Sequence, residues 1–168
     1  MIHIYCGDGK GKTTAAAGLA VRAKGAGIDT AFFQFLKDGS SSEIAQLEKL
    51  GITVTTSRCV KFTFEMTPEE KRQITEVQDA MLCRALELVK QGCGLIVLDE
   101  FFGAVTTGTL SNDAAEKFVA DFPAGAELVL TGRDPGEFFL GKADYISEIK
   151  AVRHPYSSGL PARKGIEY

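Results

Sequence analysis

The sequence predicts a single α/β domain over residues 1–168, with helices on both faces of a mostly parallel central sheet. Short runs of β-type residues alternate along the chain with helix-type segments, and this alternation is typical of parallel sheets joined by helical crossovers. Four of the β-type runs are apolar almost throughout, as expected for strands buried on both faces. The length of 168 residues suits one domain with a sizeable core.

The predicted strands are short, and helices fill most of the segments between them. We expect strands at Ile2–Tyr5, Thr30–Phe35, Ile52–Thr56, Leu95–Leu98, Glu127–Leu130 and Tyr145–Lys150. We expect helices at Lys12–Lys24, Glu43–Leu50, Pro68–Gln91 and Ser111–Asp121. Because ligands of such folds bind beyond the carboxyl ends of the strands, chemistry should follow the first, second, fourth and fifth strands.

The helix at 68–91 has the clearest boundaries in the sequence. Thr67 is suited to cap it, Pro68 to occupy its first position and Glu70 to complete a capping box. Gly92 should end it, because glycine readily adopts the left-handed conformation that follows many helices.

Composition and charge narrow the range of functions. The formal net charge is −3, which gives no support to a nucleic-acid surface, because such a surface needs a basic footprint. No apolar run approaches the length of a membrane span, and the first residues are too rich in glycine for a signal peptide. The four cysteines show no metal-binding spacing, and we expect them to be reduced thiols in a cytoplasmic protein.

The stretch 6-CGDGKGKTT-14 resembles a phosphate-binding loop of the pattern G-x-x-x-x-G-K-[ST], with Cys6 where the first glycine is expected. A strand is predicted before it and an alanine-rich helix after it, which is the frame that such a loop needs. A small side chain can occupy position 6 if its backbone angles are suitable. The alternative is a chance match. The residues expected to bind a polyphosphate are Gly7, Asp8, Gly9, Lys10, Gly11, Lys12, Thr13 and Thr14.

Each part of this loop has an expected role. Its glycines allow unusual backbone angles and keep side chains away from the phosphates. Lys12 supplies a positive charge, and Lys10 adds a second cation that suits a highly charged polyphosphate. Thr13 offers its hydroxyl to Mg²⁺.

The run 95-LIVLDE-100 is an apolar strand that ends in two acids. Carboxylates at the end of a buried strand are costly unless they are paired or bind a metal. We expect Glu100 to be a direct Mg²⁺ ligand, and Asp99 to bond toward Thr13 or a bound water. The alternative is an acid pair that caps the next turn.

The strand at 127–130 leads into Thr131, Gly132 and Arg133 at the same edge of the sheet. The planar guanidinium of Arg133 is suited to phosphate, and the alternative is a surface salt bridge with a nearby acid such as Asp134 or Glu137. The residues expected to carry catalysis are Lys12, Thr13, Glu100 and Arg133.

Matching segments run through nearly the whole chain: 5-YCGDGKGKTT-14, 34-QFLK-37, 98-LDE-100, 130-LTGR-133, 143-AD-144 with Glu148, 153-RHP-155 and 162-ARKGIEY-168. Together they resemble the P-loop ATP:corrinoid adenosyltransferases of the cobalamin pathway, which act on cob(I)alamin or cob(I)yrinic acid a,c-diamide. The ending KGIEY is the most specific segment. A loop without its first glycine is typical of this family.

The resemblance implies a three-layer P-loop NTPase fold of the RecA-like type. It implies that the 5′-deoxyadenosyl group of ATP is transferred to a cobalt(I) corrinoid and that triphosphate leaves whole, with Mg²⁺ as cofactor. No proton-transferring base is needed, because the cobalt is the nucleophile. The resemblance also implies a flavoprotein reductase as electron donor, a homodimer, and a C-terminal segment that helps to close the nucleotide site.

Phe62 and Phe64 alternate on a short run that we expect to be extended, so that both rings can face the corrinoid. We expect them to form an apolar wall that excludes water and the axial ligand of the cobalt. Two core phenylalanines are the alternative. Many relatives have Gly-Phe-Thr-Trp where this chain has 61-KFTF-64. Some relatives also have an N-terminal extension that folds over the site, and we expect another segment to take the place of such a lid here.

Two other functions are compatible with the sequence. A small nucleotide or nucleoside kinase, or an ATPase, would use the same loop but release ADP or orthophosphate. A carrier without turnover would bind ATP and corrinoid and leave both unchanged. The phosphate product separates the first alternative from adenosyl transfer, and the absorption spectrum of the reduced corrinoid separates the second.

Overall fold

Six parallel strands form the central sheet of the computed structural model, which describes residues 1–59 and 61–167. The strands are β1 Ile2–Cys6, β2 Thr30–Gln34, β3 Thr53–Thr56, β4 Leu95–Asp99, β5 Glu127–Thr131 and β6 Tyr145–Glu148. Their order across the sheet is β3-β2-β4-β5-β1-β6, and every neighbouring pair is parallel. The predicted α/β class with a parallel sheet is confirmed.

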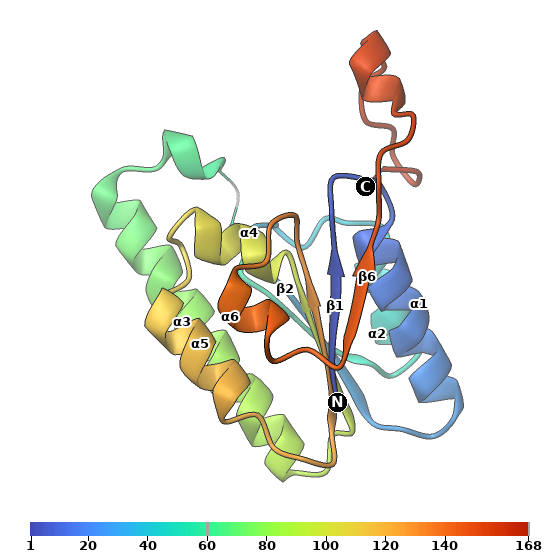
Figure 1. The fold of residues 1–168 in the computed structure, drawn as a ribbon, viewed down its shortest axis with the longest axis vertical. Coiled ribbons are helices and arrows are strands. Elements are labelled where there is room, and N and C mark those ends of the chain that lie inside the picture. Colours follow the sequence, from blue (N-terminus) through green and yellow to red (C-terminus); the bar gives the residue numbers. More distant parts are fainter. Residues whose placement is uncertain (60, 168) are drawn as a thin grey trace.

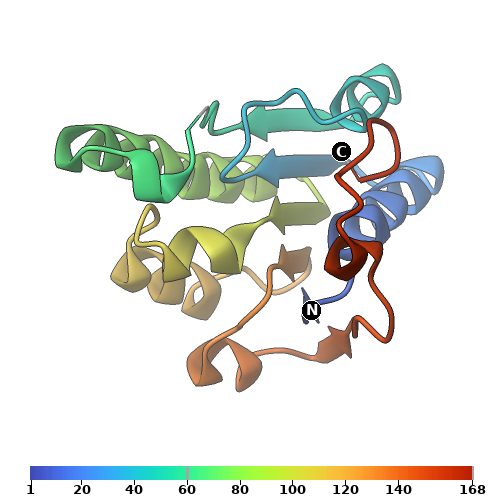
Figure 2. The same ribbon diagram turned by 90° about the horizontal axis from the view of Figure 1, so that it is seen from above.

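Helices cover both faces of this sheet and complete three layers (Figures 1 and 2). The α-helices are α1 Lys12–Gly25, α2 Ile44–Lys49, α3 Pro68–Lys90, α4 Phe101–Thr106, α5 Asn112–Ala120 and α6 Glu137–Leu140. Two short 3₁₀ helices are also present: η1 Thr63–Glu65 lies between β3 and α3, and η2 Pro155–Ser158 lies in the segment after β6. Figure 1 shows α1 and α2 on one side of the sheet and the other four α-helices on the opposite side.

The core has two parts because successive strand residues point to opposite faces of the sheet. Phe32 packs with α1 and α2, whereas its neighbour Phe33 packs with α3, α4 and α5. On α1, the buried side chains are alanines, including Ala16 and Ala20, so the helix can lie close to the strands. This close packing holds the first turn of α1, and with it the preceding loop, against the edge of the sheet.

All the expected strands and helices are present, with small differences at their ends. The capping box of α3 is formed as predicted: Glu70 N–H donates to Thr67 Oγ1, and Thr67 N–H donates to a Glu70 carboxylate oxygen. β2 ends at Gln34 instead of Phe35, since Leu36 adopts a left-handed φ of 55°. β6 ends at Glu148 instead of Lys150.

The helices α4 and α6 were not predicted. Both are short, with six and four residues, and neither has a side-chain cap. α4 also begins after a residue in the left-handed conformation, Glu100 with φ 60°, which no sequence rule anticipates for glutamate. Among the described helices, none has the length and apolar character needed to cross a lipid bilayer.

Candidate functional site

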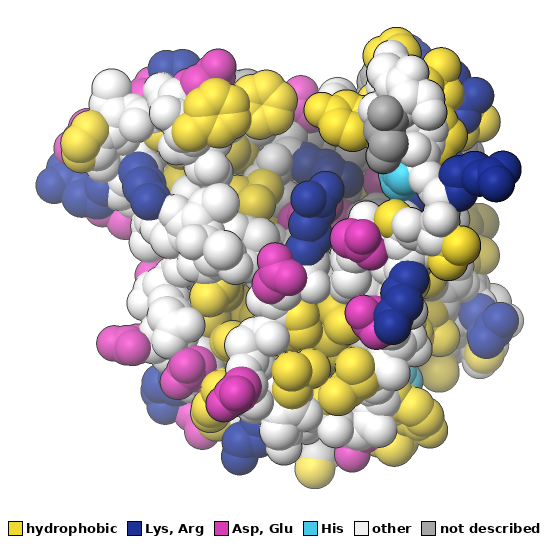
Figure 3. Space-filling view, turned by 45° about the horizontal axis from the view of Figure 1, so that its top comes forward, with side chains coloured by type: hydrophobic (Ala, Val, Ile, Leu, Met, Phe, Trp, Pro, Cys, Tyr) yellow, Lys and Arg dark blue, Asp and Glu magenta, His cyan; other side chains and the backbone are white. Residues whose placement is uncertain are grey.

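The polar residues predicted to act together surround one cavity of about 540 Å³ at the carboxyl edge of the sheet. Its walls come from the loop before α1, the loop after β2, Glu100, Arg133 and the C-terminal segment. Figure 3 shows this edge as a hollow with basic side chains, between the raised η1 region and the C-terminal segment. The sheet order contributes directly, because β5 lies between β1 and β4 and brings Thr131 between the loop and the acid pair.

Cys6 is the last residue of β1 and is buried, with 7% of its surface exposed. The place of the missing first glycine is therefore a strand position, which accepts a side chain without strain. The next residue, Gly7, has a φ of 101°, and Gly11 before α1 has a φ of 118°. These angles favour glycine, so the loop keeps its glycines where the backbone needs them.

The loop is also held by the segment that follows β6. Gly9 N–H donates to Ile149 O at 2.7 Å, and Ala151 N–H donates to the carboxylate of Asp8 at 3.0 Å. A Cβ atom on Gly9 would lie 2.7 Å from Ile149 O, which is closer than real contacts allow. Glycine at this position is therefore a requirement of packing, and the loop is a preorganised structure.

Lys12 lies within the curve of the loop. Its Nζ donates to Gly7 O and to Gly9 O, each at 2.8 Å. Burial lowers the pKa of this ammonium group below its ordinary value. Phosphate oxygens can replace the two carbonyl oxygens as acceptors, and they add negative charge.

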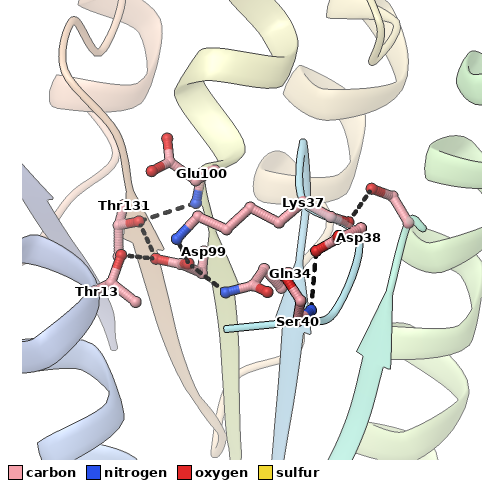
Figure 4. A network of polar contacts seen from close by, with 9 residues as sticks. Thr13, Gln34, Lys37, Asp38, Ser40, Asp99, Glu100 and Thr131 are labelled. Atoms are coloured by element: carbon pink, nitrogen blue, oxygen red, sulfur yellow. Dashed lines mark hydrogen bonds and ion pairs between the residues drawn. The ribbon is translucent and has the colours of Figure 1, made fainter. Parts of the chain in front are cut away.

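Asp99 is the centre of a buried hydrogen-bond network (Figure 4). Its side chain is fully buried, and its Oδ1 accepts hydrogen bonds from Thr13 Oγ1 and Thr131 Oγ1, each at 2.8 Å. Its Oδ2 accepts a hydrogen bond from Gln34 Nε2 at 3.2 Å. The predicted contact between Asp99 and Thr13 is therefore present, and Asp99 fixes the orientation of the Thr13 hydroxyl.

Glu100 is fixed through its backbone, while its carboxylate remains available. Glu100 N–H donates to Thr131 Oγ1 at 3.0 Å, and the side chain points away from Asp99 (Figure 4). Burial raises the pKa of the Glu100 carboxyl above its ordinary value, and the charge of Asp99 raises it further. Within the described part of the chain, this carboxylate has no hydrogen-bond or ion-pair partner. A bound cation would stabilise its charged form.

The donor set around Glu100 fits a magnesium ion. Across residues 1–59 and 61–167, no three His, Cys, Asp or Glu side chains are grouped so that they could hold a metal by themselves. A Mg²⁺ ion, however, takes one or two protein oxygens and completes its shell with phosphate and water. The unpartnered Glu100 carboxylate and the oriented Thr13 hydroxyl supply those oxygens.

Arg133 lies at the cavity and is exposed, as the phosphate-binding prediction requires. The alternative, a salt bridge with Asp134, is not found among the described residues. Gln34, Lys37 and the hydroxyl of Thr131 were not assigned roles from the sequence. They come together only through the pairing of β2, β4 and β5. The positions of Lys37 and Thr131 shortly after predicted strands were a usable indication.

Phe62 and Phe64 are exposed over 70% and 81% of their surfaces, so the alternative of two core phenylalanines is wrong. The expected extended run is also wrong, since Thr63–Glu65 forms η1. The turn nevertheless brings the two rings together, with centroids 5.4 Å apart and planes inclined by 9°. Lys61, next to the pair, forms an ion pair with Glu70 on α3 and ties the turn to that helix.

The C-terminal segment reaches the cavity from the other side. Gly165, Ile166 and Glu167 line it, and a carboxylate oxygen of Glu167 lies 3.7 Å from Lys10 Nζ. Glu167 also accepts hydrogen bonds from Arg163, which lower the pKa of its carboxyl to about 2. The expected proximity of this segment to the site is confirmed, while Tyr168 of the tail motif lies outside the described residues.

Comparison with known proteins agrees with this geometry. A family described as "ATP:corrinoid adenosyltransferase BtuR/CobO/CobP" matches residues 1–168. A corrinoid adenosyltransferase of Pseudomonas aeruginosa is 32% identical over 170 residues, which cover 100% of this chain and 83% of that protein. The corrinoid adenosyltransferase CobA of Salmonella typhimurium is 30% identical over 175 residues, covering 100% of this chain and 85% of that protein. The chain therefore belongs to the ATP:corrinoid adenosyltransferase family.

Proposed function

We propose that the protein transfers the 5′-deoxyadenosyl group of ATP to a cobalt(I) corrinoid and releases triphosphate, in adenosylcobalamin biosynthesis. The observation that carries this proposal is the cavity itself, in which a glycine-rich loop, four cations (Lys10, Lys12, Lys37 and Arg133) and the Glu100 carboxylate converge in a member of this family. In the reaction, the electron pair of cobalt(I) forms the bond to the 5′-carbon. The carbon–oxygen bond breaks, and its electron pair leaves with the triphosphate.

The loop is proposed to hold the leaving group. The backbone N–H groups at the start of α1, together with Lys10, Lys12 and Arg133, surround the place where negative charge develops. Removing one such preorganised donor from an oxyanion site costs about 10²–10³ in rate in other enzymes. Lys12 would exchange its two carbonyl acceptors for phosphate oxygens, at little cost in reorganisation.

Thr13 and Glu100 are the proposed direct ligands of Mg²⁺. Asp99 was predicted for the same metal site, and its contacts with Thr13, Thr131 and Gln34 support an indirect role through the Thr13 hydroxyl. Mg²⁺ bound there would neutralise charge on the triphosphate. The chain's own contribution is to present the Thr13 oxygen and the Glu100 carboxylate on one side of the cavity.

The stacked pair Phe62 and Phe64 is the proposed wall for the corrinoid. Two large exposed rings on this turn have no role in the core, and an exposed apolar patch commonly marks a binding surface, although neither ring is among the residues that line the 540 Å³ cavity. The wall would exclude water and the axial ligand from one face of the cobalt. The cobalt(I) state needs an electron donor, for which we propose a flavoprotein reductase. We also propose that the enzyme is a homodimer and lies in the cytoplasm.

The test is to incubate the protein with Mg-ATP and a chemically reduced corrinoid and to record the absorption spectrum. We expect a product whose cobalt–carbon bond is cleaved by light. An unchanged corrinoid spectrum, with ATP and corrinoid both bound, would instead identify a carrier and contradict the proposed transfer.

A further inference from the structure

Lys37 approaches the candidate site from the wall opposite the glycine-rich loop. It follows β2, and Figure 4 shows its side chain extending across the end of that strand toward Asp99. Its Nζ lies 3.9 Å from Asp99 Oδ2, and the side chain is 30% exposed where it lines the cavity. A partly exposed ammonium group therefore lies beside an acid that is itself fully buried.

The backbone around Lys37 is held in place on both sides. Leu36 has a φ of 55°, an angle that is rare for residues other than glycine and persists only where the surroundings impose it. Phe35 N–H donates to Asp99 O at 2.9 Å, and Lys37 O accepts a hydrogen bond from Cys59 N–H at 3.1 Å. These contacts direct the side chain of Lys37 into the cavity.

Lys37 alone does not balance the negative charges of Asp99 and Glu100. The other contacts of Asp99 come from neutral groups on Thr13, Thr131 and Gln34. The carboxylate of Glu100 has no partner among the described residues. The charges of Lys37, Lys12 and Arg133 all favour the charged form of Glu100 without pairing with it, and Lys37 is the one described cation that pairs with Asp99. A divalent cation that binds Glu100 would therefore lie next to the Lys37 ammonium group.

We propose that Lys37 is a further triphosphate-binding residue, whose ammonium group leaves Asp99 when a divalent metal ion binds at Thr13 and Glu100. A metal held by Thr13 and Glu100 would repel the ammonium over a few ångström. The long, flexible side chain can then turn to the phosphate oxygens with its three donors. Lys10 and Lys12 bind the triphosphate from the loop, and Lys37 binds it from the opposite wall. This inference rests on the proposed function.

The proposal predicts two effects of opposite sign for Lys37→Met. Calorimetric titration with tripolyphosphate in the presence of EDTA should give an affinity about tenfold weaker than that of the unchanged protein, because one charge-assisted contact is lost. Titration with Mn²⁺ alone, followed by the electron paramagnetic resonance of free Mn²⁺, should give about tenfold tighter binding. A merely structural role of Lys37 would weaken both.

The matched control is Lys117→Met on α5, which removes another lysine that forms an ion pair with an aspartate, far from the cavity. It should change neither affinity. The tripolyphosphate and Mn²⁺ affinities of Lys37→Gln are measured in the same way, and they test the proposal if Lys37→Met does not fold. Unchanged tripolyphosphate binding, or unchanged or weaker Mn²⁺ binding, in the folded Lys37 variant overturns the inference. If the unchanged protein binds no tripolyphosphate, the proposed function fails instead.

Discussion

Thr131 offers the most direct test of the polar network that builds the site. Its hydroxyl accepts a hydrogen bond from Glu100 N–H at 3.0 Å and donates one to Asp99 Oδ1 at 2.8 Å. The residue is 1% exposed, so water cannot replace either partner. Thr131→Val removes the hydroxyl and keeps the shape of the side chain.

The expected loss of stability follows from these two bonds. A hydrogen bond to a charged group contributes about 1.5–3 kcal/mol, and a buried N–H group left without a partner costs about 1–3 kcal/mol. Thr131→Val should therefore lower the free energy of unfolding by about 2.5–6 kcal/mol, a large part of the roughly 5–15 kcal/mol typical of a domain. Glu100 would also lose the bond that holds its left-handed backbone, so its carboxylate would be less well placed.

Urea denaturation measures this loss, provided that the dependence of the unfolding free energy on urea concentration stays unchanged. The control is Thr131→Ser, which keeps the hydroxyl and loses one methyl group, at a cost of about 1 kcal/mol. The reasoning is refuted if Thr131→Val costs less than about 1 kcal/mol, or no more than Thr131→Ser.

The remaining predictions concern the loop, the aromatic pair and the dependence on pH. Gly9→Ala should weaken ATP binding about tenfold or more, because the added Cβ would lie 2.7 Å from the backbone oxygen of Ile149. Calorimetry measures this affinity. The control Gly18→Ala, in open space on α1, should leave the ATP affinity unchanged. Phe64→Ala, at an 81% exposed position, should change the unfolding free energy by less than about 0.5 kcal/mol and spare ATP binding, yet slow adenosylation; equal loss of both would count against the aromatic wall. Hydrogen bonds from Lys61 and from the capping residue Thr67 hold the pKa of Glu70 at about 2, below its ordinary 4.5. The ionised Glu70 carboxylate therefore stabilises the fold above pH 4.5, and this stabilisation is lost as the pH falls toward 2. Thermal melts of Glu70→Gln should show a flatter pH dependence in that window, and an unaltered dependence would rule out this role.

The sequence was most informative where structure depends on neighbouring residues. The glycines of the loop, the Thr67–Glu70 capping box and the two acids at the end of β4 all follow from local patterns, and the structure places them at the predicted positions. The edge of the sheet at which the cavity lies also followed from the alternation of strands and helices.

Features that depend on distant contacts could not be predicted in this way. The distance between Lys37 and Asp99 depends on the pairing of β2 with β4, and the bridging position of Thr131 depends on β5 lying between β4 and β1. The turn that stacks Phe62 on Phe64 is tied to α3 by an ion pair across nine residues, so an alternating pattern suggested an extended run instead.

The central claim is that the loop and its cations hold three linked phosphates as a single leaving group. Phosphorus nuclear magnetic resonance of a reaction with Mg-ATP and reduced corrinoid tests this claim most directly. The account predicts intact tripolyphosphate, in equal amount to the alkylated corrinoid. ADP or orthophosphate as the primary product would contradict it and would identify a kinase or an ATPase.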